Sequence, residues 1–384
     1  MKIVHICLAC FFVEGMGYQE NLLPANHVAM GHQVYVLTSD YAFNSKGEQI
    51  KKNKDKYEND DGVQVEILDA ANGKGLFSRF KIYKDLFESL ERISPDIIFV
   101  HGLQFLSYKD VLKYVKRNPN VKLYADNHAD YYNTPVEKFT SQLVHRYLFG
   151  RNIRKSIKYV SKFWGVTPWR CDYLHDVYKI PKEKIHLLTM GGDDRKINFD
   201  NKVIIRDRIR KALSINDDDF VIISGGKIDE SKNIHLLLEA VRSINIDKIK
   251  VVVFGQPTDS FKEKIEVLVK HPSVRYVGWI PSDEAYNYFL SSDLCVFPGT
   301  HSVLWEQACA CGLPGLYKKW PGMCHVSIDG SGCFLEKNTS KELQEKILYM
   351  YENKETYQNM KNSAEKHKGE FFYSNIAKKA IDLG

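Results

Sequence analysis

Short apolar runs alternate with longer amphipathic stretches along most of the chain. In the first half the apolar runs have the length of strands: Ile3–Leu8, Gln33–Thr38, Val63–Leu68, Asp96–His101, Val121–Ala125 and Phe163–Val166. Stretches with helical periodicity lie between several of them, among them Tyr18–Met30, Arg79–Ile93 and Lys109–Arg117. Strands that alternate with helices are typical of parallel sheets covered on both faces, so this half predicts a doubly wound α/β domain.

The same pattern starts again in the second half. The expected strands are Phe220–Gly225, Lys248–Gly255, Ser273–Gly278 and Leu294–Gly299, with helices at about 231–243, 259–270, 283–291 and 302–311. Between the halves, Asp193–Asp219 is polar and contains no apolar run of strand type, which predicts a linker. The chain is therefore expected to form two consecutive doubly wound domains.

Composition agrees with two domains and excludes several classes of protein. The chain has 384 residues, and its 44% hydrophobic and 12% aromatic content excludes a disordered or collagen-like protein. The formal net charge of +6 is too small to indicate nucleic-acid binding, and aromatic residues are not interleaved with the basic ones at the spacing of a known nucleic-acid module. No nucleic-acid partner is expected.

The cysteines and the N-terminal residues indicate an intracellular protein. Eight cysteines in a chain of this length do not suggest a secreted disulfide framework, and Cys7 and Cys10 are better explained as buried thiols than as redox or metal groups. The apolar residues behind Met1 and Lys2 resemble a weak signal peptide, but no good cleavage site follows. Because no window approaches the roughly 20 apolar residues of a membrane-spanning helix, a cytoplasmic location is expected.

Two glycines follow the first expected strand, in Gly15-Met16-Gly17-Tyr18-Gln19-Glu20. Such glycines allow a tight turn and let backbone N–H groups approach an anion at a helix N-terminus. A dinucleotide fingerprint would need a third glycine where Glu20 stands, so NAD binding is not indicated. The alternative is a flexible strand-to-helix loop without a ligand.

A second glycine loop, Gly225-Gly226-Lys227, opens the second domain and is followed by Lys232. Two cations five residues apart on such a loop can both point at one diphosphate. Ser231 has the residue type and the place of a helix N-cap, which would bring free N–H donors beside the lysines. The alternative is a solvated loop whose lysines face water.

The stretch from Pro298 to Pro314 contains a short helix that Gly312 ends. Its first turn, about Ser302 to Trp305, would offer unpaired N–H groups. Glu306 within this helix could accept hydrogen bonds from two vicinal hydroxyls, such as those of a ribose. The alternative is a solvated Glu306 with His301 as an ordinary loop residue.

Polar residues also follow two expected strands of the first domain. His101 ends the apolar strand that begins at Asp96, and His128 comes soon after the strand Val121–Ala125. Ligands of open α/β sheets lie outside the carboxyl ends of the strands, which makes both histidines candidate site residues. Ordinary polar loop residues are an equal alternative.

Taken in order, these segments resemble glycosyltransferase family 4, whose members are retaining, nucleotide-sugar-dependent enzymes with the GT-B fold. The resemblance runs over nearly the whole chain and rests on Gly15-Met16-Gly17 with Gly31-His32-Gln33-Val34, Pro95-Asp96-Ile97-Ile98 to His101, Lys184-Ile185 to Gly191-Gly192-Asp193, Gly226-Lys227 with Lys232, and Glu306 with Ala308-Cys309-Ala310-Cys311-Gly312-Leu313-Pro314. Two positions depart from the family pattern. Pro298 stands where the family has the first of two glutamates, and Lys227 stands where it has arginine.

The resemblance implies an α/β protein of the GT-B class, with two Rossmann-like doubly wound domains that face a central cleft. The first, over 1–195, would take the acceptor; the second, over 196–365, would bind the nucleotide sugar; and a C-terminal helix over 366–384 would cross back to the first. The implied enzyme is a metal-independent retaining glycosyltransferase of the hexosyltransferase type. It would use a UDP- or GDP-linked sugar, without a further cofactor, to build cell-surface polysaccharide or glycoconjugates.

The family motifs also imply roles for individual residues. The implied donor-binding residues are Gly15, Gly17, Gly226, Lys227, Lys232, His301, Ser302, Val303 and Glu306, and the implied catalytic residues are His128, Lys232 and Glu306. Lys227 and Lys232 would hold the diphosphate, and amides at Ser302–Val303 would assist them. Glu306 would bind the ribose. His128 would hold the sugar or its neighbouring backbone, while the Gly15–Gly17 loop would close over the reacting bond.

Two other functions fit the same motifs. Pro298 is compatible with a GT-B protein that still binds a nucleotide but has lost transfer. A GT-B epimerase that acts on the sugar nucleotide alone would need the same donor site. Tight binding without turnover would identify the first, and product formed without an acceptor would identify the second.

The positive charge of the chain is concentrated in one stretch. Lys138 to Lys162 contains seven Lys or Arg residues and no Asp or Glu, with Leu143, Tyr147, Leu148, Ile153, Ile157 and Val160 at mostly helical spacing among them. Either this stripe packs on the sheet beneath a solvated charged face, or the surface meets an anionic membrane or a lipid-linked acceptor. The second alternative suits the glycan or lipid-linked acceptor that the resemblance implies, with peripheral binding at the inner face of the plasma membrane.

Overall fold

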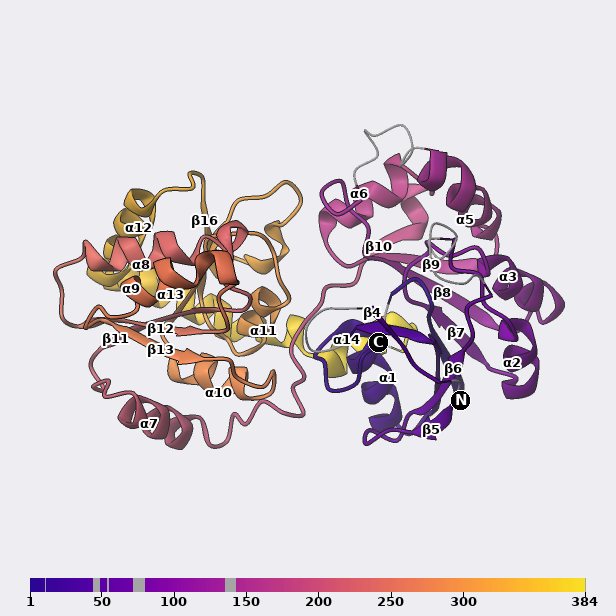
Figure 1. Cartoon of the computed structure of the whole chain (residues 1–384), viewed down its shortest axis with the longest axis horizontal. Helices are drawn as coiled ribbons and strands as arrows, with labels where there is room; N and C mark the ends of the chain where they lie inside the picture. Colours follow the sequence, from indigo (N-terminus) through magenta and orange to yellow (C-terminus); the bar gives the residue numbers. More distant parts are fainter. Residues whose placement is uncertain (11, 44–48, 54, 72–79, 135–142, 384) are drawn as a thin grey trace. The chain divides into compact units, whose positions relative to one another are not determined.

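The computed structural model describes residues 1–384 except 11, 44–48, 54, 72–79, 135–142 and 384. The chain divides into two compact units (Figure 1). Unit 1 comprises Met1–Thr189 and Ile376–Gly384, and unit 2 comprises Met190–Asn375. Each unit is a largely parallel sheet with helices on both faces, which confirms the expected pair of Rossmann-like domains.

Unit 1 is built on an eight-stranded sheet in the order β10-β9-β8-β7-β1-β2-β6-β5. Its strands are β1 Lys2–Cys7, β2 Gln33–Ser39, β5 Lys56–Glu58, β6 Gln64–Leu68, β7 Ile97–Val100, β8 Lys122–Asn127, β9 Val160–Gly165 and β10 Ile185–Leu187; a separate antiparallel pair is β3 Tyr41–Phe43 with β4 Gln49–Lys51. All neighbours in the large sheet are parallel except β5, which pairs antiparallel with β6. Because β1, β7 and β8 are parallel neighbours, the residues that follow them meet at one edge of the sheet.

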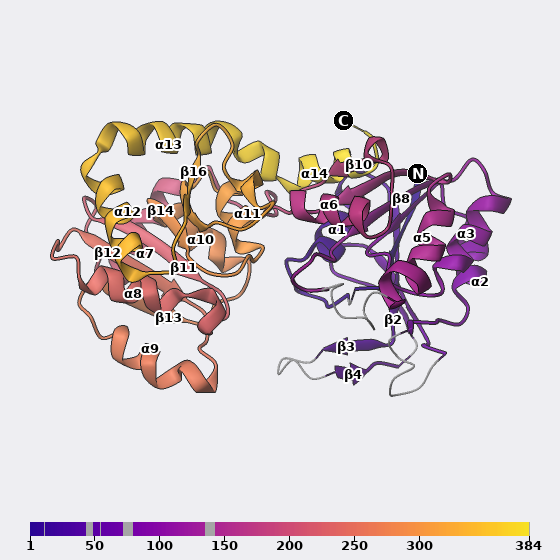
Figure 2. The same ribbon diagram turned by 90° about the horizontal axis from the view of Figure 1, so that it is seen from above.

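Helices cover the two faces of the unit 1 sheet. On one face lie α2 Leu86–Ile93, α3 Tyr108–Arg117 and α5 Gly150–Ser156, and on the other lie α1 Gln19–Ala29 and α14 Tyr373–Ala380 (Figures 1 and 2). The split follows from right-handed crossovers, because the connection from β1 to β2 runs toward one edge and those from β6 through β9 run toward the other. The helix α6 Pro168–Asp176 connects β9 to β10.

Unit 2 contains a six-stranded parallel sheet in the order β13-β12-β11-β14-β15-β16. Its strands are β11 Phe220–Gly225, β12 Ile249–Phe254, β13 Val274–Gly278, β14 Leu294–Phe297, β15 Gly315–Lys318 and β16 Gly332–Leu335. The chain runs from β11 to the β13 edge and then returns to β14 on the other side of β11. Ligands of open α/β sheets bind where the strand order reverses, here beyond the ends of β11 and β14.

The helices of unit 2 also divide between the two faces. One face carries α8 Ile234–Arg242, α9 Lys262–Leu268 and α12 Ser340–Glu352; the other carries α7 Lys202–Ala212, α10 Glu284–Ser291 and α11 Leu304–Ala310 (Figure 1). α13 Lys354–His367 then leads toward α14. Among the helices that the structure describes, none is both long and apolar enough to cross a membrane.

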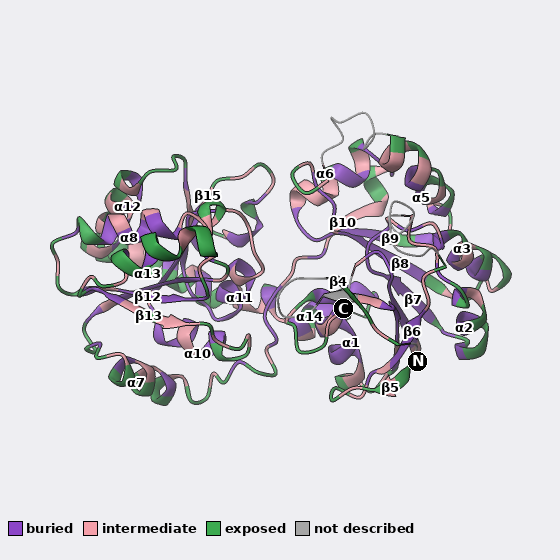
Figure 3. Ribbon diagram, in the orientation of Figure 1, coloured by how far each residue is buried: buried purple, intermediate pink, exposed green. Residues whose placement is uncertain are grey.

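Each unit has its own buried core, visible in the sheet and on the inner helix faces (Figure 3). In unit 1, Leu90 of α2, Val111 of α3 and Ile153 of α5 are completely buried in one cluster with strand residues such as Val100. In unit 2, Leu237 and Leu238 of α8 are completely buried with Val251 and Val253 of β12. Burying such side chains stabilises each unit by about 1.5–3 kcal/mol per residue.

The two compact units are bounded by slightly different residues than the expected domains. Unit 1 ends after Thr189 instead of 195, and the chain returns to unit 1 after Asn375 instead of at 366. The stretch Asp193–Asp219, expected to be a linker, contains α7. The polar composition of this stretch wrongly suggested a linker, because one of its charged residues is part of the interior of unit 2. Arg210 of α7 is buried there and pairs with Asp293 at 2.7 Å.

The described strands that were not anticipated are all short: β3, β4, β5, β10, β15 and β16. β10 has three residues, and β15 and β16 have four each. Runs of this length are too short to produce a hydrophobic pattern of their own. They form because a neighbouring strand already supplies the hydrogen-bonding edge: β9 for β10, and β14 for β15.

Candidate functional site

The glycine loop after β11 fits against the loop after β12. Gly226 has a φ of +106°, and its N–H donates to the carbonyl of Phe254 at 3.1 Å. A Cβ at position 255 would lie 1.8 Å from the carbonyl oxygen of Gly226, so only glycine fits there. The predicted phosphate loop therefore has a backbone fixed by close contact with its neighbour.

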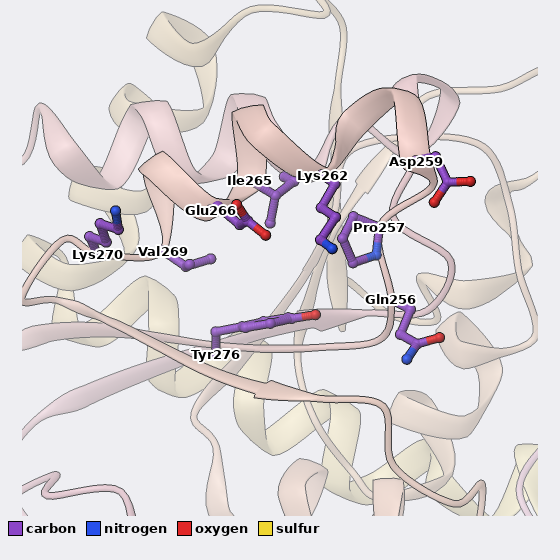
Figure 4. A pocket seen from close by; sticks show the side chains of 9 residues that line it. All are labelled: Gln256, Pro257, Asp259, Lys262, Ile265, Glu266, Val269, Lys270 and Tyr276. Carbon is purple, nitrogen blue, oxygen red and sulfur yellow. The ribbon is translucent and has the colours of Figure 1, made fainter.

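A surface hollow of about 610 Å³ borders this pair of loops. In Figure 4 the ring of Tyr276 lies across the hollow below α9, with Gln256 and Pro257 at one end. The hydroxyl of Tyr276 donates to the carbonyl of Gly255 at 2.8 Å. Tyr276 thus supports the Gly255 turn on which the phosphate loop rests.

Lys232 lies against the loop that follows β14. Its Nζ donates to the carbonyl oxygens of Thr300 at 2.8 Å and His301 at 3.1 Å. A Cβ at position 299 would lie 2.2 Å from the carbonyl carbon of Lys232, so Gly299 is required by this close approach. Burial lowers the pKa of Lys232, because desolvation disfavours the charged ammonium. The structure therefore brings the second and third sequence motifs together.

Lys227 has a different environment. Its side chain is 68% exposed, and its Nζ lies 3.5 Å from the carboxylate of Asp229. Burial alone would raise the pKa of Asp229, but the hydrogen bond from Ser231 and the charge of Lys227 lower it. The charge of Lys227 also lowers the pKa of Lys232. The loop thus presents one exposed and one partly buried cation that repel each other.

Ser231 does not cap a helix, and that prediction is wrong. It lies in a 3₁₀ turn, Glu230–Lys232, and α8 begins only after Asn233, whose φ is +54°. Ser231 Oγ instead donates to Asp229 Oδ1 at 2.6 Å, and its carbonyl accepts from the N–H of Thr300 at 2.9 Å. The 3₁₀ turn occupies the place where the first helical turn was expected.

Pro298, the departure from the family pattern, has a structural role in this loop pair. Its carbonyl oxygen accepts from Nδ2 of Asn233 at 3.1 Å. The indole N–H of Trp320 donates to the carbonyl of the next residue, Gly299, at 3.4 Å. The loop after β14 is therefore held from two sides without a carboxylate at position 298.

Glu306 of α11 is completely buried. Its Oε1 accepts from Nε2 of His301 at 2.7 Å and from Nε2 of His325 at 2.8 Å. Burial would raise the pKa of Glu306, but the two imidazoles lower it to about 2. Its Oε2 is buried and has no hydrogen-bond partner among the residues that the structure describes.

This geometry corrects the simple picture of Glu306. The carboxylate is not solvated. Only one of its two oxygens is left for a diol, because His301 and His325 both hydrogen-bond to Oε1. Oε2 is the acceptor left for a ligand hydroxyl. The side chain of His301 is 10% exposed and that of His325 is 2% exposed, so His301 is the member nearest to solvent.

The start of α11 lies two residues later than expected. The helix begins at Leu304, Val303 precedes it, and the carbonyl of Ser302 accepts from the N–H of Trp305 at 3.1 Å. Contact of the Ser302 and Val303 amides with an anion stays a prediction.

In unit 1, Asp126 at the end of β8 connects both candidate histidines. Its Oδ2 lies 3.0 Å from Nδ1 of His101, and its Oδ1 lies 3.2 Å from Nε2 of His128. The N–H of Gly102 donates to Oδ1 at 2.8 Å, and Nε2 of Gln19 donates to Oδ2 at 3.2 Å. Burial would raise the pKa of Asp126, but the two histidines lower it, so Asp126 is an anion shared by two imidazoles.

His128 is the more accessible of the two histidines, with 23% of its side chain exposed. Burial lowers its pKa, but the charges of Asp126 and Glu20 outweigh this and raise it. Nε2 of His128 lies 3.9 Å from Oε1 of Glu20, in the first turn of α1. His128 is thus the group at the edge of a buried acidic centre that a ligand could reach.

Three groups of described residues have ligand atoms within 4.8 Å of one another and could hold a metal ion: Cys10 with Glu20 and His128, His101 with Asp126 and His128, and His301 with Glu306 and His325. In each group, hydrogen bonding or ion pairing among the members is an alternative use of the same atoms. Cys7 and Cys10 are free thiols whose pKa is raised by burial, as expected for unreactive cysteines. Metal independence stays a prediction.

The first glycine motif forms a loop before α1. Gly15 has a φ of +74° and is exposed, with no atom within 4 Å of the place of a Cβ. Glycine is needed at 15 for the backbone conformation and not for close approach. Gly17 is partly exposed, two residues before α1 begins at Gln19. Closure of this loop over a bound sugar stays a prediction.

The basic stretch is only partly a helix face. Residues 135–142, and with them Lys138, lie outside the described residues; a π-helical segment Leu143–Phe149 precedes α5. The expected apolar stripe is divided, because Ile153 and Val160 are buried while Leu143 and Tyr147 are 45% and 67% exposed. A hollow of about 730 Å³ lies between α3 and α5, lined by Leu112, Lys113, Lys116, Arg154, Lys155, Ile157, Lys158 and Tyr159.

Sequence reasoning missed several residues of these clusters. Asp126 directly follows the expected strand Val121–Ala125 but was not predicted as a site residue, and His325 gave no signal because it contacts Glu306 from 19 positions away. His5 did give a signal in the sequence, because it is a histidine inside the apolar strand Lys2–Cys7. In the structure it is completely buried. A polar residue that interrupts a buried strand requires buried partners, and these are His27 and His101.

Part of the chain is similar to a known family and to two glycosyltransferases. Residues 205–367 match the family described as Glycosyl transferases group 1. An uncharacterized glycosyltransferase of Methanocaldococcus jannaschii is 23% identical over 281 residues, covering 58% of this chain and 75% of that protein. Lipopolysaccharide 1,2-N-acetylglucosaminetransferase of Salmonella typhimurium is 29% identical over 140 residues, covering 33% of this chain and 37% of that protein.

The fold of the chain is also that of solved glycosyltransferase-like structures. Anabaena HepE, determined in complex with UDP-glucose, superposes with a TM-score of 0.66 at 13% identity, covering 100% of this chain and 98% of that one. At this identity the likeness shows the fold alone. Within that fold, the loops that carry Lys227, Lys232 and Glu306 all lie inside the matched segment. Residues 205–367 are therefore similar to the Glycosyl transferases group 1 family, in a chain with the two Rossmann-like domains of the GT-B fold.

Proposed function

We propose that the protein is a retaining glycosyltransferase that moves a hexose from a UDP- or GDP-linked donor to a glycan or lipid-linked acceptor. The observation that carries the proposal is the contact of Lys232 with the loop that leads to His301 and Glu306. A diphosphate-binding cation and a ribose-binding carboxylate have to lie close together to hold one nucleotide. Lys232 and Glu306 meet this requirement through the loop at Thr300 and His301, within the segment that matches the Glycosyl transferases group 1 family.

The lysines would stabilise the departing nucleoside diphosphate. Burial lowers the pKa of Lys232, and the nearby charge of Lys227 lowers it further, so the two lysines repel each other. A diphosphate between them would remove that repulsion and gain two charge-assisted hydrogen bonds. The attraction grows as negative charge develops on the leaving oxygen, so it favours the transition state over the bound donor.

The reaction proposed here is a front-face substitution. The bond from the anomeric carbon to the phosphate oxygen breaks while the acceptor oxygen bonds to the same face of that carbon. The acceptor hydroxyl gives its proton to the departing phosphate oxygen, so atoms and charge balance without an enzyme nucleophile. His128, at the exposed edge of the Asp126 centre, would hold the sugar or its neighbouring backbone. The Gly15–Gly17 loop would exclude water from the reaction.

A negatively charged acceptor is favoured by the surface of unit 1. Lys113 and Lys116 of α3 and Arg154 and Lys155 of α5 line the hollow between these helices, together with apolar side chains such as Ile157. A hollow lined by both cations and apolar side chains suits an amphiphile with an anionic head. The Salmonella relative is named for lipopolysaccharide, a lipid-linked glycan, which agrees with this choice.

A two-stage experiment tests the proposal. The full chain is titrated with UDP- and GDP-linked sugars, and the tightest binder is then incubated with oligosaccharide and lipid-phosphate acceptors while nucleoside diphosphate is measured. Acceptor-dependent release, with an unchanged anomeric configuration of the product by NMR, supports the proposal. Tight binding without release would identify a nucleotide-binding protein that has lost transfer. A changed sugar nucleotide in the absence of any acceptor would identify an epimerase.

A further inference from the structure

Three histidines form a continuous buried chain in unit 1, referred to here as the histidine chain: His27, His5 and His101. Nε2 of His27 lies 2.9 Å from the carbonyl oxygen of Ala377. Nδ1 of His27 lies 3.0 Å from Nε2 of His5, and Nδ1 of His5 lies 2.9 Å from Nε2 of His101. All three rings are completely buried.

The carbonyl at one end determines the position of each hydrogen. A backbone carbonyl can only accept, so Nε2 of His27 carries a hydrogen and, in the neutral ring, Nδ1 accepts. Nε2 of His5 must then donate to His27, which leaves Nδ1 of His5 as the next acceptor. Nε2 of His101 donates to it in turn. The donor and acceptor roles in every hydrogen bond of the histidine chain follow from the contact of His27 with the carbonyl of Ala377 in α14.

At the other end, a neutral His101 would be repelled. With its hydrogen on Nε2, it would leave an unprotonated Nδ1 only 3.0 Å from Oδ2 of Asp126, and this buried nitrogen has no other hydrogen-bond partner among the described residues. Asp126 is itself an acceptor, because the N–H of Gly102 and Nε2 of Gln19 both donate to it. Two acceptors at this distance repel unless a hydrogen lies between them. One more hydrogen than three neutral rings supply would remove this repulsion.

We propose that the histidine chain holds this additional hydrogen on Nδ1 of His101, so that His101 is an imidazolium paired with Asp126. The pair cancels the charge of the carboxylate that also faces His128. In this role His5 and His27 are positioning residues: they contact no ligand, and they set the charge beside His128 through His101. The role assigned to His128 rests on the proposed function, whereas the hydrogen count rests on geometry alone.

The other charged and titratable groups around this centre come from several elements. Glu20 of α1 and Arg170 of α6 act on His128 with opposite signs, and Cys10 lies close enough to share a metal ion with it. Arg170 is itself paired with Asp130 at 3.1 Å. Beside the histidine chain, His32 lies 6.4 Å from His27 between ring centroids. His32 neighbours the histidine chain without belonging to it.

Two substitutions at position 27 separate hydrogen placement from simple packing. In His27→Gln, the amide nitrogen can donate to Ala377 and the amide oxygen can accept from His5, which preserves the direction of the chain. In His27→Phe, no acceptor remains for Nε2 of His5. His5 can then donate from Nδ1 to His101, and His101 can release its additional hydrogen while still donating to Asp126. His32→Phe is the control for a changed ring beside position 27.

Ring-nitrogen NMR of the full chain, labelled at histidine, tests the proposal from pH 5.5 to 8.5. In the wild type and in His27→Gln, we expect both ring nitrogens of His101 to carry a hydrogen. His5 should carry a single hydrogen, on Nε2. In His27→Phe we expect one hydrogen on each, and an upward shift of the His128 titration midpoint because Asp126 is no longer neutralised. His32→Phe should leave both readings unchanged.

A single hydrogen on His101 in the wild type overturns the proposal, and this reading needs no variant to fold. Equal His128 midpoints in the Gln and Phe variants also overturn it, because packing would then explain the cluster. These spectra need no donor or acceptor, so they remain decisive if no sugar transfer is found. Conversely, transfer activity together with a neutral His101 would refute the histidine chain and leave the proposed function intact.

Discussion

Nε2 of His325 lies 2.8 Å from Oε1 of Glu306. Glu306 lies within α11, whereas His325 comes after the next strand, β15. Together with His301, His325 holds a carboxylate ionised inside the protein, where burial alone would favour the neutral acid. The buried Oε2 is then a preorganised acceptor. An acceptor fixed before a ligand arrives costs little further ordering when a ligand hydroxyl binds.

The first prediction concerns acid stability. Because the folded protein lowers the pKa of Glu306 to about 2, the unfolded chain takes up a proton on this group first as pH falls. Its contribution to the free energy of unfolding is complete above about pH 4.5 and is lost as pH falls toward 2. We expect Glu306→Gln to flatten the loss of stability over this window, by urea unfolding at several pH values. An unchanged slope would contradict the assigned pairing.

The second prediction concerns the ribose. Glu306→Gln should weaken binding of UDP or GDP, and it should weaken binding of the 2′-deoxy analogue much less, because the lost acceptor serves a hydroxyl that the analogue lacks. Isothermal titration gives both affinities. Glu342→Gln is the matched control, since Glu342 is also a buried carboxylate of unit 2 but accepts from the backbone of Glu336 and Lys337. Equal losses for both ligands would leave Glu306 with a purely structural role.

The alternation of strands and helices was enough to predict both domains, because a buried parallel strand must be apolar and its covering helix amphipathic. It could not reveal that Arg210 belongs inside unit 2, since a buried ion pair has no local pattern. The same holds for the site. Lys232 and Glu306 were found from motifs, but His325 reaches Glu306 only through the fold. Spatial neighbours that are distant in sequence leave no periodic signal.

The third prediction separates the two lysines. Replacing either Lys227 or Lys232 with alanine should weaken binding of the nucleoside diphosphate by roughly 1.5–3 kcal/mol, the size of a charge-assisted hydrogen bond. Lys227→Ala should leave the free energy of unfolding within about 0.5 kcal/mol, because the side chain is exposed. Lys232→Ala should also destabilise unit 2, because its Nζ holds the carbonyls of Thr300 and His301. The control is Lys341→Ala on the surface of α12. Unchanged affinity in both variants would place the diphosphate elsewhere.

The fourth prediction is that transfer survives removal of divalent metal. Two lysines can offset the charge of the leaving diphosphate, which is the task that a divalent metal would otherwise perform. After dialysis against EDTA, the rate of nucleoside diphosphate release should be unchanged, and added Mg²⁺ or Mn²⁺ should not raise it. Loss of activity that either ion restores would refute metal independence. It would direct attention to the His301, Glu306 and His325 group, whose ligand atoms are close enough to hold a metal.

The last prediction concerns the basic hollow of unit 1. Arg154, Lys155 and Lys158 line it together with apolar side chains, and Arg151 is exposed on the same helix as Arg154. The protein should co-sediment with vesicles that contain anionic lipid but not with neutral ones, since each cation near such a surface contributes about 1 kcal/mol. Salt should release it as the Debye length shortens. Reversal of these four residues to Glu should abolish sedimentation and leave nucleotide affinity unchanged, because all four lie in unit 1 and the proposed donor site lies in unit 2. If the wild type ignores anionic vesicles at low salt, the cations are a solvated face and the acceptor is a soluble sugar.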